Sequence, residues 1–235
     1  MQEFLQGVAA FAAYVLPVAG FMFVARAFVK IPDELFRKIL HFILLGAYFP
    51  FLYGFETWWL SVLLALLIVA VAYPIFVLLG RLETFSSFVN ERKRGEFKSS
   101  LILAMLVEAA SVTICWGIFD DRLLALACVY AWGVGDGMAA LVGKQFGKHK
   151  ISLPYADPKK SWEGSGTMFL CSLISVLVIL LVRGGLDLWI CLLTAVLAAT
   201  ATTIVELYTK GGWDTVTCPM AAMLVILPMT QLLGG

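Results

Sequence analysis

GVGDGMAALVGKQFGKHKISLPYADPKKSWEGSG, residues 133–166, begins as an apolar segment with one aspartate, Asp136, and continues as a basic loop rich in glycine. A carboxylate inside a membrane is costly, and it marks a functional site because it needs a cation, a proton or a polar partner. Carboxylate oxygens suit magnesium, while ammonium groups and backbone amides suit phosphate. The stretch therefore predicts a site for a metal-bound polyphosphate.

The composition predicts that this site belongs to a membrane protein. Of the 235 residues, 61% are apolar and only 14% are charged, whereas soluble domains carry about a quarter charged residues. The chain is therefore predicted to be an all-α, polytopic integral membrane protein. Its formal net charge of +1 gives no indication of a nucleic-acid partner. The five cysteines lie singly in apolar segments and are interpreted as small apolar residues.

Apolar segments near the length that crosses a bilayer, about 20 residues, occur eight times. They are predicted at residues 4–27, 36–55, 58–79, 99–119, 123–142, 167–182, 186–205 and 216–233. Pro50 is expected to interrupt the second. With these helices, all of the 17 basic residues except Arg122 and Arg183 fall on one side. The positive-inside rule makes that side cytoplasmic and places both termini outside, so the predicted site faces the cytoplasm.

Individual roles follow from the residue types. Asp136 is the first predicted magnesium ligand, and it lies about 9 Å below the predicted helix end at residue 142, at 1.5 Å per residue. Five lysines are expected to place positive charge beside the phosphates. They are Lys144, Lys148, Lys150, Lys159 and Lys160. Glycines are expected to let backbone amides approach the phosphates, and they are Gly143, Gly147, Gly164 and Gly166. Ser161 and Ser165 are placed just before the sixth predicted helix, whose N-terminus favours anions.

Several motifs in this stretch resemble a known enzyme family. They are Gly135-Asp136-Gly137, Phe146-Gly147, His149-Lys150 and Lys159-Lys160-Ser161-Trp162. These are similar to the CTP-dependent polyprenol kinases, which include phytol and dolichol kinases, within the phosphatidate cytidylyltransferase superfamily. Three outlying patches fit the same family, and they are Arg37-Lys38 with His41, the basic loop from Arg92, and Glu206 with Asp214.

The resemblance implies transfer of the γ-phosphoryl group of CTP to an isoprenoid alcohol in the bilayer, with a magnesium ion as cofactor. Asp214 or Glu206 would be the second metal ligand, or the group that orients or deprotonates the attacking hydroxyl. One membrane domain, residues 1–235, is expected, with the nucleotide site carried by loops 80–98 and 143–166. A paired arrangement of two chains is also expected by analogy.

Departures from the family pattern bear on the choice of reaction. Ala140 stands where phytol kinases tend to carry a second aspartate, and Thr215 replaces the family asparagine after the late aspartate. The C-terminal signature of the cytidylyltransferases is missing, which favours a kinase over nucleotidyl transfer. Diacylglycerol is a further candidate acceptor. A transporter would predict inverted repeats, and the sequence shows none.

Simpler explanations stay open for single residues. Asp136 has the alternative of pairing with Lys144 or bonding to a neighbouring helix, and the lysine cluster has the alternative of binding anionic lipid. Glu108, in mid-span, either lines the pocket or ties two helices together. Arg92 either contacts the nucleotide or belongs to a solvated loop.

Overall fold

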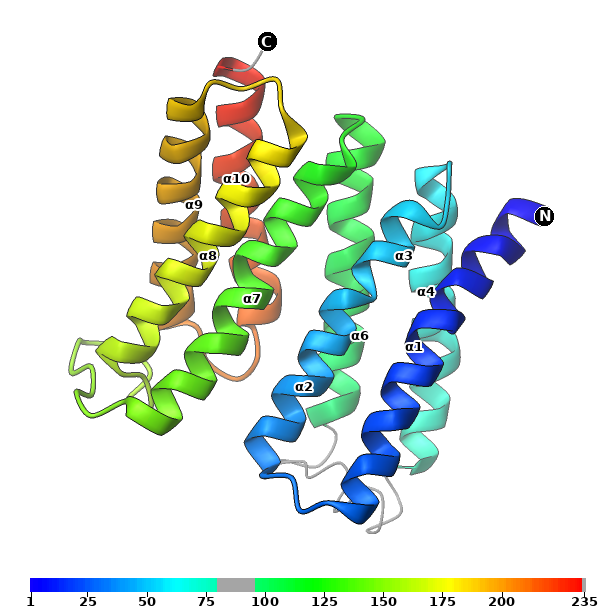
Figure 1. Ribbon diagram of the computed structural model, residues 1–235, viewed down its shortest axis with the longest axis horizontal. Helices are drawn as coiled ribbons and strands as arrows, with labels where there is room; N and C mark the ends of the chain where they lie inside the picture. The colour runs from blue at the N-terminus through cyan, green and yellow to red at the C-terminus, as the bar shows by residue number, and fades with distance from the viewer. Residues whose placement is uncertain (80–95, 234–235) are drawn as a thin grey trace. The chain divides into compact units, whose positions relative to one another are not determined.

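The computed structural model describes residues 1–79 and 96–233, which are almost entirely helical (Figure 1). Within these described ranges, eight helices are long and apolar enough to cross a membrane. They are Gln2–Phe28, Asp33–Tyr53, Trp58–Leu79, Lys98–Ile118, Arg122–Phe146, Trp162–Arg183, Leu188–Tyr208 and Asp214–Leu233. Each overlaps its predicted range, so the prediction of an all-α integral membrane protein with eight spans is confirmed. All five cysteines are free thiols.

The chain divides into two compact units, Met1–Thr113 and Ile114–Gly235, and each is treated by itself. The helices of the first unit are α1 (Gln2–Phe28), α2 (Asp33–Gly46), α3 (Tyr48–Tyr53), α4 (Trp58–Leu79) and α6 (Glu96–Ser111). The helices α2 and α3 form one span that is interrupted at Ala47. Pro50 explains the interruption, because it has no N–H to donate to the carbonyl of Gly46.

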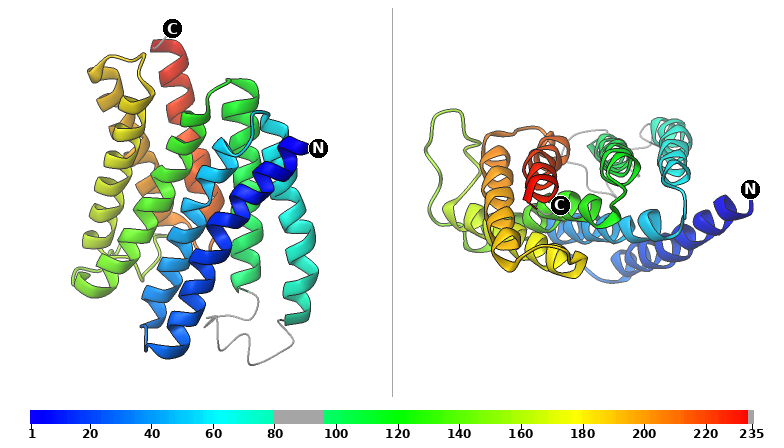
Figure 2. Two further views of the ribbon diagram at one scale, coloured as in Figure 1. Left: turned by 45° about the vertical axis from the view of Figure 1, so that its right-hand side comes forward. Right: turned by 90° about the horizontal axis from the view of Figure 1, so that it is seen from above.

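The second unit is a bundle of α7 (Arg122–Phe146), α8 (Trp162–Arg183), α9 (Leu188–Tyr208) and α10 (Asp214–Leu233), preceded by the π-helix η1 (Val112–Ile118). The α7–α8 loop and the α9–α10 connection lie at one end of this bundle, and the α8–α9 turn lies at the other (Figures 1 and 2). At that other end Arg183 Nε donates to Asp121 Oδ2 at 2.5 Å. Arg122 and Arg183 are thus separated from the lysines of the long loop, as the sequence predicts.

Small residues at a spacing of four let α7 and α8 approach closely. Gly135, Ala139 and Gly143 share one face of α7. A Cβ atom on Gly135 would lie 2.5 Å from Ser172 Oγ and 2.6 Å from Met168 Sδ, both on α8. Ser172 Oγ also donates to the carbonyl of Ala131. This close contact fixes the face of α7 that points into the bundle.

Substitution of Gly135 by leucine is expected to lower the free energy of unfolding by about 1–3 kcal/mol, the usual cost of overpacking. The change should appear as a lower thermal midpoint of the purified protein in detergent. Gly166→Leu is the matched control, since a Cβ atom there meets no atom within 4 Å. Equal thermal midpoints for the two variants would contradict the close α7–α8 contact.

Two helix boundaries differ from the sequence prediction at the α7–α8 loop. The helix α7 continues past residue 142 to Phe146, and α8 begins at Trp162 and not at residue 167. Asp136 is therefore ten residues from the end of its helix, about 15 Å along the axis and deeper than predicted. Ser161 is the N-cap of α8, accepting a hydrogen bond from the Gly164 N–H at 3.2 Å. Ser165 lies within the first turns of the helix, so its predicted place before the helix is wrong.

Candidate active site

Asp136 lies on the side of α7 that faces the interior of the bundle. Trp132, four residues earlier, and Ala139, three residues later, share its helix face. Both are buried in one cluster with Met168 of α8 and Cys218 of α10. Asp136 is itself half-buried. The predicted carboxylate is therefore inside the bundle and not on its lipid-facing side.

Further charges gather around the same part of the bundle. The Cys218 thiol is within electrostatic range of Asp214, Asp136 and Lys160. These come from α10, α7 and the α7–α8 loop, so three segments that are distant in the sequence meet here. Asp214 is half-buried in the first turn of α10, where a negative charge is favourable because it faces the positive end of the helix dipole.

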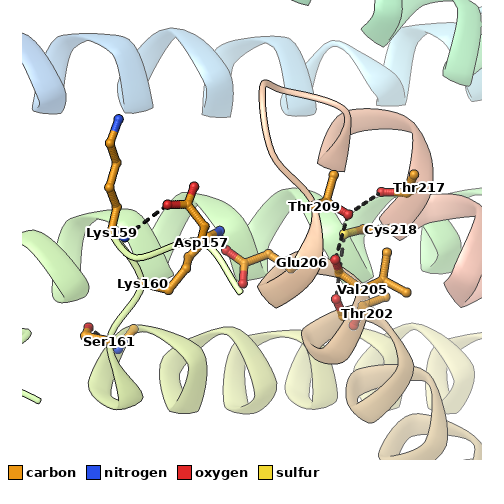
Figure 3. Close-up of polar contacts among 11 residues, drawn as sticks. Asp157, Lys159, Lys160, Ser161, Thr202, Val205, Glu206, Thr209, Thr217 and Cys218 are labelled. Carbon is orange, nitrogen blue, oxygen red and sulfur yellow. Dashed lines mark hydrogen bonds and ion pairs between the residues drawn. The ribbon is translucent and has the colours of Figure 1, made fainter. Parts of the chain in front are cut away.

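Glu206, near the end of α9, forms an ion pair with Lys160 Nζ through its Oε1 atom. The Glu206 residue is only 3% exposed, and Lys160 is half-buried. In Figure 3 the two side chains extend toward each other from the loop and from α9. The second carboxylate oxygen, Oε2, is buried and has no hydrogen-bond partner within the described ranges. Glu206 therefore keeps one acceptor atom available for a ligand.

The α7–α8 loop is attached to the same end of α9. The Asp157 N–H donates to the carbonyl of Leu207 at 3.2 Å. Ile151 and Ala156 bury their side chains against Leu207. Leu207 directly follows Glu206, so the apolar contact and the Lys160 ion pair act on adjacent residues. Together these contacts fix the loop beside the charged end of the bundle.

Glu163 holds the two ends of the loop together. Its carboxylate accepts hydrogen bonds from the N–H groups of Lys148 and His149, and His149 Nδ1 lies 2.7 Å from Oε1. The Trp162 N–H donates to the carbonyl of His149 at 3.0 Å. This role of Glu163 is not among the predictions from the sequence. Glu163 lies two residues after the N-cap Ser161, in the first turn of the helix, where acids are common. This position in the sequence could have indicated a structural role for Glu163.

The five predicted lysines occupy different environments. Lys150 Nζ donates to the carbonyl of Lys159 at 3.2 Å, inside the loop. Lys144 is in the last turn of α7, and it is exposed, as are Lys148 and Lys159. Lys160 alone among these five is half-buried. It is therefore the lysine best placed to serve a ligand inside the bundle.

Three of the predicted glycines lie at close backbone contacts. A Cβ atom on Gly143 would lie 3.4 Å from the Cα atom of Gly164, so α7 and α8 meet there almost backbone to backbone. A Cβ atom on Gly147 would lie 2.1 Å from the carbonyl oxygen of Gly143. Ser165 is 9% exposed, and its Oγ atom has no hydrogen-bond partner in the described part of the chain. Contact of any of them with phosphate stays a prediction.

The outlying candidates lie in the first unit or outside the described residues. Arg37 Nη2 lies 3.8 Å from Glu34 Oε1, next to Lys38 on α2. The rings of His41 and Phe42 form a T-shaped pair. Glu108 of α6 is 4% exposed, and its Oε1 atom is buried without a partner in the described residues. Arg92 and most of the predicted 80–98 loop fall outside the described ranges.

The carboxylates of the second unit fit a magnesium ion that takes most of its ligands from phosphate and water. The described residues contain no group of three or more His, Cys, Asp or Glu side chains able to hold a metal. Magnesium commonly uses only one or two carboxylates beside a substrate phosphate. Asp136 and Asp214 could supply these, and the partnerless Oε2 atom of Glu206 is a further oxygen donor.

The fold and this site define an integral membrane protein with acidic and basic groups gathered at one end of a helical bundle. The model of the Cytidylyltransferase family matches residues 3–209, and the chain belongs to this family. Phytol kinase from Synechocystis sp. is 34% identical over 157 residues, which are 63% of this chain and 60% of that protein. The chain thus spans less than two thirds of the length of this relative. No solved structure matches the chain. The family resemblance drawn from the sequence motifs is confirmed.

Proposed function

We propose that the protein is a CTP-dependent lipid kinase that transfers the γ-phosphoryl group to an isoprenoid alcohol of the phytol, polyprenol or dolichol type. The observation that carries the choice of a kinase is the 34% identity to a phytol kinase. The inward-facing Asp136, with Asp214 and Lys160 within electrostatic range of the same Cys218 thiol, supports a site for a metal-bound triphosphate. The similarity to a phytol kinase supports an alcohol as the phosphoryl acceptor. The reaction would take place at the cytoplasmic side of the membrane, where the positive-inside rule places the lysines.

In this reaction the hydroxyl oxygen of the lipid attacks the γ-phosphorus, and the bond to the bridging β–γ oxygen breaks, so that CDP leaves. Asp136 and Asp214 would hold magnesium, which when bound neutralises charge on the phosphates. Lys160 would contact the triphosphate, with the other four lysines as further predicted contacts. Glu206 would be a further oxygen ligand or would accept the proton of the hydroxyl. A homodimer stays a prediction.

A second reaction is favoured by the description of the family itself. A cytidylyltransferase would join the α-phosphate of CTP to a phosphorylated lipid such as phosphatidate and release diphosphate. A CTP-dependent diacylglycerol kinase would differ from the proposed enzyme only in its acceptor. All three reactions use the same nucleotide and metal, so the arrangement of charges favours none of them over the others.

The position of the label in the lipid product separates these reactions. Purified protein with magnesium would receive γ-labelled or α-labelled CTP together with phytol, geranylgeraniol, undecaprenol, dolichol, diacylglycerol or phosphatidate in separate reactions. We expect γ-label in an isoprenoid phosphate. Label from the α position in a phosphatidate product would show a cytidylyltransferase, and γ-label in diacylglycerol alone would show the third reaction.

A further inference from the structure

The tip of the α7–α8 loop, residues 152–155, exposes apolar side chains at the end of a membrane-spanning bundle. Leu153 is 41% exposed and Tyr155 is 87% exposed, and Pro154 between them is exposed as well. Ile151 and Ala156, on either side of the tip, are buried against α9. The loop is thus fixed by one set of apolar side chains and presents another set outward.

Backbone contacts fix the shape of this tip. The Ile151 N–H donates to the carbonyl of Lys160 at 3.2 Å, and the Ala156 N–H donates to that of Leu153 at 3.3 Å. Tyr155 has a φ angle of 67°, in the left-handed region that bulky residues rarely adopt. Such a conformation is strained and persists only where its surroundings enforce it. The folded loop therefore fixes the backbone from which the exposed Tyr155 side chain projects.

The loop projects to the side of the bundle. Viewed along the helices, it extends outward beyond α9 and does not cover the end of the bundle (right-hand view of Figure 2). The helices of the bundle are long and apolar enough to cross a bilayer. A loop that leaves the end of such helices sideways lies over the surface of the surrounding lipid.

The charge of the loop complements an anionic lipid surface. Lys148, Lys150 and Lys159 are exposed on it. The nearby carboxylates already accept hydrogen bonds from the loop itself. Asp157 Oδ1 accepts one from the Lys159 N–H at 3.0 Å, and Glu163 Oε1 accepts one from the His149 N–H. Basic residues beside a membrane are attracted to anionic headgroups, and tyrosine is enriched at the level of the headgroups.

We propose that residues 152–155 insert into the headgroup region of the bilayer that the protein itself spans. Tyr155 and Leu153 lie at the boundary with the acyl chains, and Lys148 and Lys159 contact anionic lipid phosphates. Lys160, which extends toward Glu206, is not part of this contact. The proposal assigns Lys148 and Lys159 to lipid phosphates in place of the triphosphate contacts predicted from the sequence, and its test needs no kinase reaction.

Fluorescence of a labelled full-length chain tests the insertion without any nucleotide or acceptor. Tyr155→Cys would carry the environment-sensitive fluorophore NBD in vesicles of phosphatidylcholine, with or without phosphatidylglycerol and with nitroxide-labelled lipid as a quencher. Lys210→Cys, exposed at the same end of the bundle, is the matched control, and the unsubstituted protein measures labelling of the native cysteines. We expect blue-shifted emission and quenching at least about twofold stronger at position 155, since an interfacial probe is within reach of the nitroxide.

Replacing Lys148 and Lys159 by glutamine in the labelled protein is expected to weaken quenching in vesicles that contain phosphatidylglycerol and to leave it unchanged in phosphatidylcholine alone. Emission and quenching at position 155 equal to those at position 210 would overturn the proposal. Blue-shifted emission without lipid quenching would also overturn it, because the tip would then be covered by protein.

Discussion

The Asp136→Asn variant is expected to lose at least about 100-fold in the rate of γ-phosphoryl transfer, the usual minimum for removal of one group that stabilises charge in a transition state. Asparagine has nearly the same shape as aspartate but carries no charge, so the packing around Trp132 and Ala139 should be retained. The measurement is the transfer of γ-label from CTP to the isoprenoid acceptor under saturating magnesium.

Asp187→Asn is the matched control for this variant. Asp187 is exposed at the opposite end of the same bundle, and its side chain makes no capping hydrogen bond to α9. Its substitution should leave both the activity and the thermal midpoint unchanged. Full activity of Asp136→Asn would remove Asp136 from the site and leave it as a polar contact between helices.

The features that could be predicted from the sequence depend on local composition. Long apolar segments are enough to predict the eight spans, because a bilayer requires about 20 apolar residues for each crossing. Asp136 could be singled out because an acid within such a segment is rare. Its inward direction could not be predicted, since it depends on Met168 and Cys218 packing against its face of α7.

The end of α7 shows how tertiary contact overrides local propensity. The sequence predicts a helix end at residue 142, and Gly143 is compatible with that end because glycine disfavours the helix interior by about 1 kcal/mol relative to alanine. The helix nevertheless continues to Phe146, and Gly143 serves instead as the point where the backbone of α8 passes closest. A single sequence does not reveal that the two glycines, Gly143 and Gly164, meet.

Ion pairs between residues that are far apart in the sequence could not be predicted either. From the sequence the five loop lysines are equivalent, whereas the structure pairs Lys160 with Glu206, which is 46 residues away. The same contact changes the interpretation of Glu206. The prediction from the sequence places Glu206 only at magnesium or at the lipid hydroxyl, and the structure shows that it also fixes the loop to α9.

Breaking the Lys160–Glu206 pair is expected to cost about 3–5 kcal/mol of stability, because removal of one partner leaves a buried charge uncompensated. Lys160→Met removes the ammonium group and keeps most of the side-chain volume, while Glu206 stays only 3% exposed. The thermal midpoint in detergent should fall by roughly 10 °C, given about 2–4 °C per kcal/mol for a protein of this size. Lys159→Met, at the exposed neighbouring position, should change stability by less than about 0.5 kcal/mol.

The double variant Lys160→Met with Glu206→Gln separates structure from chemistry. Removing both charges should restore most of the lost stability, since replacing a buried ion pair by neutral side chains is often nearly neutral. Activity should not return with stability, because the proposed reaction needs the Lys160 ammonium for the triphosphate and the Glu206 carboxylate for the metal or the hydroxyl. A double variant that is both stable and active would show that the pair serves only to attach the loop to α9, and the chemistry would then depend on Asp136 and Asp214. A single Lys160→Met variant as stable as the parent protein would contradict the ion pair between the half-buried Lys160 and the buried Glu206.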